Sequence, residues 1–178
     1  CHSAEAVQYS YKNGFFKPEL QEDNFGFCEE VCPAAGNWLK EIDPKKKWGR
    51  YINASVTWSS DPQLRFNASS GGTITAISEY LLKKKLVDEI IHTSVSKQSQ
   101  IKTEYTKSKS IEELRDKTGS RYTVSSPLIE LLQCVSPNKK YAVVGKPCDI
   151  LALRRYLEAH QELNINIVYL ISFFCAGV

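Results

Sequence analysis

Two continuous apolar stretches stand out in the last third of the chain. They are YAVVG at residues 141–145 and INIVYLISFFC at residues 165–175. Apolar runs without polar alternation are typical of parallel strands that helices cover on both faces. The residues between the two runs have the apolar spacing of a helix, so the pattern predicts a β-α-β unit whose strands are parallel neighbours.

Strand and helix patterns also alternate through the middle of the chain. Residues 67–85, NASSGGTITAISEYLLKKK, carry apolar side chains at helical spacing, with Ser70 as the candidate N-cap. The next stretch, LVDEIIHTSV at residues 86–95, predicts a strand. Before the helix, GRYINASVTW at residues 49–58 alternates apolar and polar side chains and predicts another strand.

Two shorter helices are predicted between these elements and the final strands. Ser110 and Glu113 have the spacing of a capping box, and Gly119 is placed to end this helix in a left-handed conformation. Ser126–Pro127 offers an N-cap and a first helical residue for LIELLQCV at residues 128–135. Together these patterns predict an α/β fold with a mostly parallel or mixed sheet flanked by helices.

The N-terminal part of the chain has a different character. Residues 1–48 show weak periodicity and predict a small irregular segment. Within it, Asn13 and Gly14 lie between aromatic-rich flanks, which predicts a β-hairpin. The stretch Pro-Lys-Lys-Lys at residues 44–47 separates this segment from the α/β part at residues 49–178.

Composition limits the classes of protein that fit. The chain has 178 residues, 42% of them hydrophobic, which suffices for the core of one domain. A formal charge of +3 is too mild to predict nucleic-acid binding, so the basic runs at 45–47 and 83–85 are solvated faces or a docking patch for an acidic partner. No membrane-spanning run or signal peptide is evident, which predicts a cytoplasmic protein. Because the chain starts at Cys1 and contains no methionine, it is expected to be a fragment of a longer protein.

Two cysteines near the final strands are the first candidates for chemistry. Cys148 follows the first apolar strand and begins a helix, and Cys175 ends the second strand. Since parallel neighbours end at the same edge of a sheet, the two thiols are expected to converge there. The helix dipole is expected to stabilise the thiolate of Cys148, which suits a metal ligand or a nucleophile. An inert buried thiol is the third interpretation.

Cys28 and Cys32 form a second candidate pair. The pattern Cys28-x-x-x-Cys32-Pro resembles the end of a ferredoxin-type cluster motif. The other cysteines of that motif are missing, although Cys1 offers one further ligand. The pair is therefore part of an iron–sulfur site or a degenerate remnant with free or structural thiols.

Gly71 and Gly72 precede the predicted helix and admit two interpretations. Without side chains they let the backbone approach a phosphate closely, or they serve a loop that needs an unusual dihedral angle. The usual dinucleotide and nucleoside-triphosphate motifs are absent from the sequence. The three histidines have no metal-ligand spacing.

Four segments in order resemble one family, the beta subunits of coenzyme F420-reducing hydrogenase and its dehydrogenase relatives. They are SSGGTITAISEYLLKKKLVDEII, SIEELRDKTGSRYTVSSPL, VVGKPCDILALRR and ISFFCAGV, and they extend over about residues 60–178. The resemblance implies that residues 49–178 are the N-terminal α/β flavin-binding part of the beta subunit domain. It also implies that residues 1–48 are a degenerate ferredoxin-like iron–sulfur segment.

The resemblance implies an FAD-containing iron–sulfur oxidoreductase. In such proteins flavin exchanges a hydride with a deazaflavin, and a nearby 4Fe-4S cluster passes single electrons onward. The implied cluster ligands are Cys148 and Cys175, with two further thiolates beyond residue 178. Lys146 is expected to place positive charge near the flavin. The residues that the resemblance places against FAD are Ser70, Gly71, Gly72, Thr73, Gly119, Ser120 and Tyr122.

The implied partners are a deazaflavin or another redox donor, and an electron-transfer protein or sister subunit. No nucleic acid is expected among them. Two other functions stay open at this level. One is a non-catalytic interaction domain that has lost its cofactors. The other is thiol catalysis with Cys148 as the nucleophile, for which no histidine base is evident.

Overall fold

A computed structural model describes most of the chain, namely residues 7–13, 15–20, 30–35, 51–97, 102–123, 125–128, 131–163 and 165–175. The strands are β1 (Val7–Lys12), β2 (Phe15–Leu20), β3 (Glu89–Val95), β4 (Thr103–Ser108), β5 (Tyr141–Gly145) and β6 (Ile167–Ser172). The α-helices are α2 (Pro62–Asn67), α3 (Thr73–Lys83), α4 (Ile111–Arg115), α5 (Leu131–Cys134) and α6 (Pro147–Ala159). Short 3-10 helices are η1 (Pro33–Ala35), η3 (Ser69–Gly72) and η4 (Gln161–Leu163).

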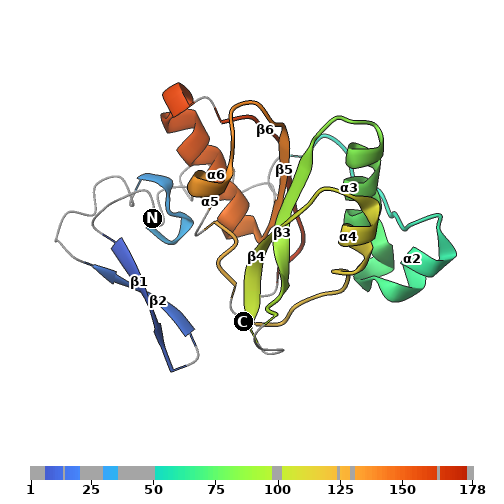
Figure 1. Cartoon of the computed structure of the whole chain (residues 1–178), viewed down its shortest axis with the longest axis horizontal. Coiled ribbons are helices and arrows are strands. Elements are labelled where there is room, and N and C mark those ends of the chain that lie inside the picture. Colours follow the sequence, from blue (N-terminus) through green and yellow to red (C-terminus); the bar gives the residue numbers. More distant parts are fainter. Residues whose placement is uncertain are drawn as a thin grey trace.

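Strands β3 to β6 form one mixed sheet in the order β4-β3-β5-β6. β3, β5 and β6 run parallel, whereas β4 pairs antiparallel with β3. The predicted β-α-β unit is confirmed, because β5 and β6 are parallel neighbours connected through α6. Helices lie on both faces of the sheet (Figure 1), which confirms the predicted α/β class.

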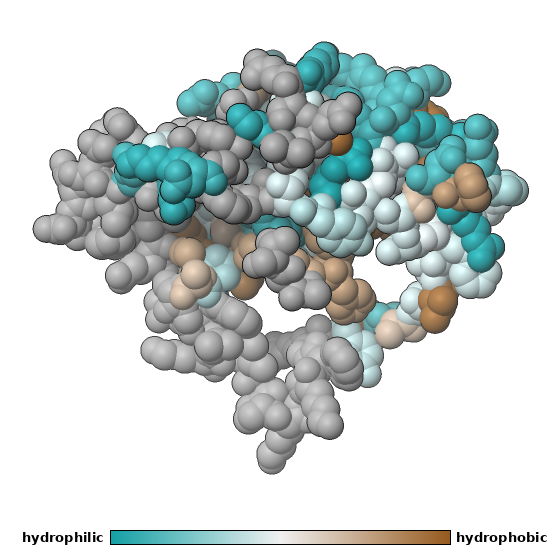
Figure 2. Space-filling model, turned by 90° about the horizontal axis from the view of Figure 1, so that it is seen from below, coloured by the Kyte–Doolittle hydropathy of each residue, from teal (hydrophilic) through white to brown (hydrophobic). Residues whose placement is uncertain are grey.

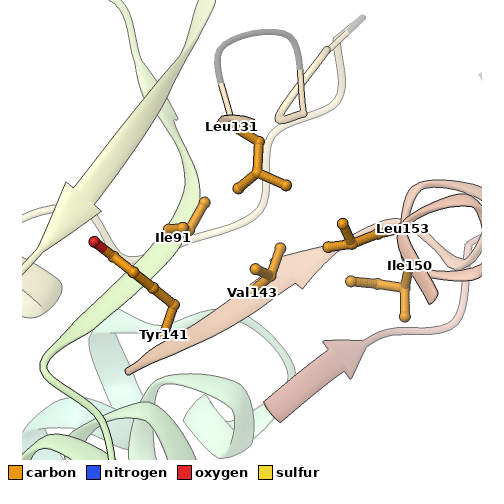
Figure 3. Close-up of a cluster of buried hydrophobic side chains, with 6 residues drawn as sticks. All are labelled: Ile91, Leu131, Tyr141, Val143, Ile150 and Leu153. Atoms are coloured by element: carbon orange, nitrogen blue, oxygen red, sulfur yellow. The ribbon is translucent and has the colours of Figure 1, made fainter. Parts of the chain in front are cut away.

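Each face of the sheet has its own hydrophobic core. Figure 1 shows α3 and α4 on one face and α5 and α6 on the other. Ile90 and Ile91 are consecutive on β3, so they point to opposite faces and enter different cores. Burial of such a side chain contributes about 1.5–3 kcal/mol, and this holds each helical layer on the sheet. The core in Figure 3 consists of Ile91, Leu131, Tyr141, Val143, Ile150 and Leu153. The other consists of Leu81, Val87, Ile90, Leu114 and Ala142.

Two predictions around the Gly-Gly segment are wrong. Residues 51–58 form no strand, because this stretch leads into a contact with the Gly-Gly turn, where the Ser59 N–H donates to the carbonyl of Gly71 at 2.7 Å. Ser70 does not cap α3, since Gly72 occupies that position and Ser70 has a left-handed backbone with φ of 51°. The observed cap in this region belongs to α2, where the Asp61 carboxylate accepts from two backbone N–H groups.

The predictions around α4 hold in part. The Ser110 hydroxyl accepts from the Glu113 N–H at 3.2 Å, as a capping box requires. The Glu113 carboxylate, however, accepts from the Lys109 N–H at 2.8 Å instead of returning to Ser110. Gly119 has the predicted positive φ, 98°, but α4 already ends at Arg115.

The helix predicted at residues 128–135 starts later than expected. Ser126 and Pro127 lie in a non-helical segment, and α5 begins at Leu131. The reason lies one residue earlier, where Lys146 binds both the carbonyl and the hydroxyl oxygen of Ser125 and holds this segment outside a helix. Pro127 is fully buried.

The hairpin prediction is confirmed by the antiparallel pairing of β1 with β2. Asn13 has a positive φ of 55°, as a tight turn of this kind requires, while Gly14 lies outside the described residues. Within the described residues no helix has the length and apolar character needed to cross a membrane.

Candidate functional site

The Gly-Gly segment forms an unusual turn at the start of α3. Ser70, Gly71 and Gly72 have consecutive positive φ values of 51°, 70° and 74°, and Thr73 is the first helical residue. A Cβ on Gly71 would lie 3.0 Å from the Cβ of Trp58, and one on Gly72 would lie 3.3 Å from Leu64. Glycine is required here by both backbone conformation and packing.

This turn has the local geometry of an anion-binding segment. Successive backbone N–H groups in left-handed and then right-handed conformations form a concavity that suits a phosphate. At the start of α3, backbone N–H groups point outward and the positive end of the helix dipole favours an anion. The Thr73 hydroxyl donates to the carbonyl of Thr57 at 3.0 Å, so it also ties residues 51–58 to this turn.

The second predicted segment lies directly against the first. The backbone N–H of Ser120 donates to the hydroxyl oxygen of Ser69 at 2.8 Å. These residues are 51 positions apart in the sequence. The fold therefore brings the two segments that carry the predicted FAD residues into contact.

Two residues beside Gly119 add to this region. Tyr122 exposes 90% of its surface, so its ring is free to stack on a flat ligand. Arg121 lies in an exposed position and donates to the carbonyls of Thr118 and Ser120, at 3.3 Å each. Sequence reasoning missed Arg121 and Ser69. The basic residue inside GSRY was the available signal for Arg121, whereas nothing in the sequence pointed to Ser69.

Lys146 lies two residues before Cys148 and contacts Ser125, which follows the GSRY segment. Its ammonium donates to the carbonyl of Ser125 at 2.8 Å and to the hydroxyl of the same residue at 2.9 Å. It also forms an ion pair with Asp149 at 3.2 Å. The Asp149 carboxylate is mostly buried, and burial raises the pKa of Asp149, although the Lys146 charge opposes that rise.

Cys148 and Cys175 lie at the same edge of the sheet. Gly145 pairs with Ser172 at the ends of β5 and β6, and each cysteine is the third residue after its paired position. Both thiols are free and both residues are exposed. The predicted parallel pairing of β5 and β6, which brings the two cysteines that follow these strands to the same edge, is confirmed.

The expected electrostatics of Cys148 are wrong in direction. Partial burial raises the pKa of the Cys148 thiol, and the neighbouring Asp149 carboxylate raises it further. The Lys146 charge and backbone hydrogen bonds act in the opposite sense but are smaller. The thiol is therefore protonated at neutral pH and is a poor free nucleophile, whereas a metal displaces such a proton on binding.

Of the second candidate pair of cysteines, the structure describes only one member. Cys32 is half-buried beside η1, and Cys28 lies outside the described residues. In the part of the chain that the structure describes, no three His, Cys, Asp or Glu side chains gather as a metal site. The Gly-Gly turn and the exposed Tyr122 have the chemistry that a flavin nucleotide requires, and the two edge cysteines are half the number of thiolates that a 4Fe-4S cluster needs.

The flavin and cysteine candidates face one end of the molecule. In Figure 1 the chain after α4 passes below the sheet, at the end where α2 also lies. Figure 2 views the molecule from this end and shows apolar atoms interspersed with polar ones around a hollow. Ligands of open α/β sheets bind at this carboxyl edge. The candidate residues thus gather where the fold is suited to bind them.

Comparison with known proteins gives matches over most of the chain. The N-terminal model of coenzyme F420 hydrogenase/dehydrogenase, beta subunit, matches residues 54–133, and the C-terminal model of the same subunit matches residues 138–178. The F420-dependent formate dehydrogenase subunit beta of Methanocaldococcus jannaschii is 33% identical over 121 residues, which cover 67% of this chain and 31% of that protein. The coenzyme F420-dependent sulfite reductase of the same organism is 30% identical over 88% of this chain and 26% of that protein.

A solved structure supports the fold. One chain of the F420-reducing NiFe hydrogenase complex from Methanosarcina barkeri, studied by xenon derivatization, matches with a TM-score of 0.66 and 21% identity. The match covers 75% of this chain and 47% of that chain, so this chain spans less than half the length of each of these proteins. The chain belongs to the coenzyme F420 hydrogenase/dehydrogenase beta subunit family.

Proposed function

We propose that this chain is the flavin-binding part of an iron–sulfur electron-transfer oxidoreductase. The observation that carries the proposal is the contact between Ser69 and Ser120, which joins two segments distant in sequence at the carboxyl edge of the sheet. Cys148 and Cys175 lie at the same edge. Relatives named as F420-dependent oxidoreductase subunits support this class of activity.

The residues of the Gly-Gly turn are assigned to the phosphates of FAD. Gly71 and Gly72 leave the backbone free to approach the ligand, and the N–H groups at the start of α3 donate to it. Ser70 and Thr73 flank this backbone, and Thr73 also fixes its position through Thr57.

The GSRY segment is assigned to the remaining surface of the cofactor. Gly119 allows the chain to turn with a positive φ, and Ser120 is fixed by Ser69. The exposed ring of Tyr122 is available to stack. Lys146 contributes positive charge close to this segment. Flavin, when bound, supplies the exchange between two-electron hydride chemistry and single-electron transfer.

The donor or acceptor of the hydride is assigned to the deazaflavin class, because the named relatives depend on coenzyme F420. Another redox donor remains compatible with the same flavin site. The beta subunit names of the relatives also favour a sister subunit or electron-transfer protein as partner. A reducing, cytoplasmic setting belongs to the proposal, since cluster-ligating cysteines require thiols that are kept reduced.

Cys148 and Cys175 are assigned as two ligands of a 4Fe-4S cluster, and Cys28 and Cys32 as ligands of a second site in the N-terminal segment. A nucleophilic role for Cys148 is disfavoured because burial raises the pKa of its thiol. A cofactor-depleted interaction domain is not favoured either, because the relatives are named as oxidoreductases.

The test is purification of the longest natural form of the protein without oxygen. Flavin absorption bands, together with a broad absorbance that bleaches on reduction, are expected, with iron and acid-labile sulfide present. Cys148→Ser should lower the iron content while retaining FAD. Cys134→Ser is the matched control, because Cys134 is half-buried in α5 and lies away from this edge. A colourless protein that cannot be reconstituted with FAD, iron and sulfide contradicts the proposal.

A further inference from the structure

The Lys146 ammonium contacts three oxygens within the protein. A lysine ammonium has three donors and no acceptor. Three oxygens lie within reach of its Nζ: the carbonyl and hydroxyl of Ser125, at 2.8 and 2.9 Å, and the Asp149 carboxylate at 3.2 Å. The Lys146 side chain is 23% exposed and that of Asp149 is 18% exposed, so the group is largely shielded from water.

These contacts join two parts of the candidate site. Ser125 follows the GSRY segment assigned to FAD, three residues after Tyr122, and the described residues 119–123 and 125–128 are together called the FAD segment. Lys146 is two residues before Cys148. The Asp149 carboxylate also accepts from the Lys146 backbone N–H at 3.3 Å, which fixes the start of α6. The side chain of Lys146 thus ties the FAD segment to the turn of helix that carries Cys148.

The FAD segment depends on a few anchors. Ser69 holds Ser120 at its beginning, and the fully buried Pro127 fixes its end. Lys146 provides the anchor between them through Ser125. Loss of the Lys146 ammonium removes both hydrogen bonds that it donates to Ser125, which increases local opening of the segment.

We infer that Lys146 is a positioning residue that couples the FAD segment to the cysteine-bearing end of α6. The identity of the ligand rests on the proposed function, whereas the coupling rests on the contacts of Lys146 alone. Binding of FAD orders residues 119–128, and the latch formed by Lys146, Ser125 and Asp149 transmits that order to residues 146–150. Order imposed on residues 146–150 is likewise transmitted to residues 119–128, since coupling between two sites is reciprocal.

The experiment measures backbone amide exchange with deuterium by mass spectrometry, with and without FAD. It compares the wild type with Lys146→Met, which removes the ammonium, and Ser125→Ala, which removes only the hydroxyl acceptor. Ser125→Thr restores a hydroxyl and serves as the rescue variant. Arg154→Met is the matched control, because it removes an exposed cation from the same helix.

Without FAD, the amides of residues 119–128 should exchange at least about threefold faster in Lys146→Met than in the wild type. In Ser125→Ala the increase in exchange rate should be smaller. Ser125→Thr and Arg154→Met should match the wild type. In the wild type, FAD should slow amide exchange at both residues 119–128 and residues 146–150. In Lys146→Met, FAD should no longer slow exchange at residues 146–150. Its dissociation constant for FAD, from quenching of flavin fluorescence, should rise about five- to tenfold.

The three negative outcomes have different meanings. Equal exchange of residues 119–128 in all these proteins without FAD overturns the latch, whether or not FAD binds. So does retention of FAD protection at 146–150 in a folded Lys146→Met variant. A wild type that neither quenches flavin fluorescence nor gains protection overturns the proposed function, while exchange in the ligand-free proteins still decides on the latch. Circular dichroism establishes that each variant is folded. If Lys146→Met does not fold, Ser125→Ala, which removes only one hydroxyl, still tests the latch.

Discussion

The hydroxyl oxygen of Ser69 accepts a hydrogen bond from the backbone N–H of Ser120 at 2.8 Å. One residue lies beside the Gly-Gly turn and the other lies in the GSRY segment. Neither position is buried, so the bond does not belong to a core. Its effect is to set the distance between two loops whose residues are assigned to the same ligand.

Ser69→Ala is expected to weaken FAD binding more than it weakens the fold. Loss of the acceptor releases Ser120, while exposure to water limits the cost to the free energy of unfolding to about 0.5–1 kcal/mol. The dissociation constant for FAD should rise severalfold, as measured by fluorescence quenching. Ser69→Thr keeps the hydroxyl and should bind like the wild type. Equal affinity in Ser69→Ala and the wild type contradicts this role.

Alanine should be tolerated less well at Gly71 than at Gly119. Both residues have positive φ, which costs a non-glycine residue about 1–2 kcal/mol. A Cβ at position 71 also meets the Trp58 Cβ at 3.0 Å, whereas at position 119 the nearest atom is the flexible Arg121 guanidinium at 3.4 Å. Chemical denaturation should therefore show a larger loss for Gly71→Ala. The opposite order contradicts the packing described for the Gly-Gly turn.

His92 should make the stability of the protein depend on pH. Its Nε2 lies 2.8 Å from the Ser108 hydroxyl, and burial lowers the pKa of His92 from the ordinary 6.5 to about 4, with the Lys117 charge acting in the same direction. The unfolded chain binds this proton more tightly than the native chain does. The stability that neutral His92 contributes to the free energy of unfolding is therefore complete above pH 6.5 and is lost as the pH falls towards 4.

The size of this effect is up to about 3 kcal/mol in the free energy of unfolding. Urea denaturation at pH 7 and pH 5 should show a clear loss for the wild type at the lower pH. His92→Gln should show a smaller loss, because the titrating group is gone. His160→Gln changes a more exposed histidine and should retain the wild-type difference. An equal loss in His92→Gln contradicts the assignment to His92.

Glu89→Gln should destabilise the protein from the amino end of β3. The Glu89 side chain is only 2% exposed, and its carboxylate lies 2.6 Å from the Lys139 ammonium and 3.7 Å from that of Lys107. Loss of the charge weakens a buried, charge-assisted contact by about 1–3 kcal/mol. Thermal or chemical unfolding measures the change. Glu158→Gln, at an exposed position on α6, should leave stability unchanged.

The sheet was predictable where burial on both faces leaves an apolar run. β5 shows this pattern, whereas β6 is an apolar run at the edge of the sheet with Val168 and Tyr169 exposed; the parallel pairing of the two strands follows from the helix between them. β4 was not predicted, because its sequence TEYTKS is mostly polar, as an edge strand permits. Residues 49–58 were predicted as a strand from their alternation. The described residues 51–58 form no strand, and Thr57 contacts the Gly-Gly turn through Thr73 instead.

The candidate site was predictable in its backbone and less so in its contacts. Gly71, Gly72 and Gly119 all have the positive φ that makes glycine informative in a sequence. Hydrogen bonds between distant side chains and backbone leave no periodic signal, so the role of Ser69 was not predictable. The pKa of Cys148 depends on burial and on Asp149, and the helix dipole alone gave the wrong direction.

The order of the strands has a consequence for how the chain holds together. β5 belongs to the second stretch matched by the family models, yet it lies between β3, from the first stretch, and β6. The junction at residues 134–137 therefore separates two sequence models without separating two folding units. A chain cut there would leave β3 and β5 each with an open hydrogen-bonding edge, and the halves would regain their structure only by reassembling as complementary fragments.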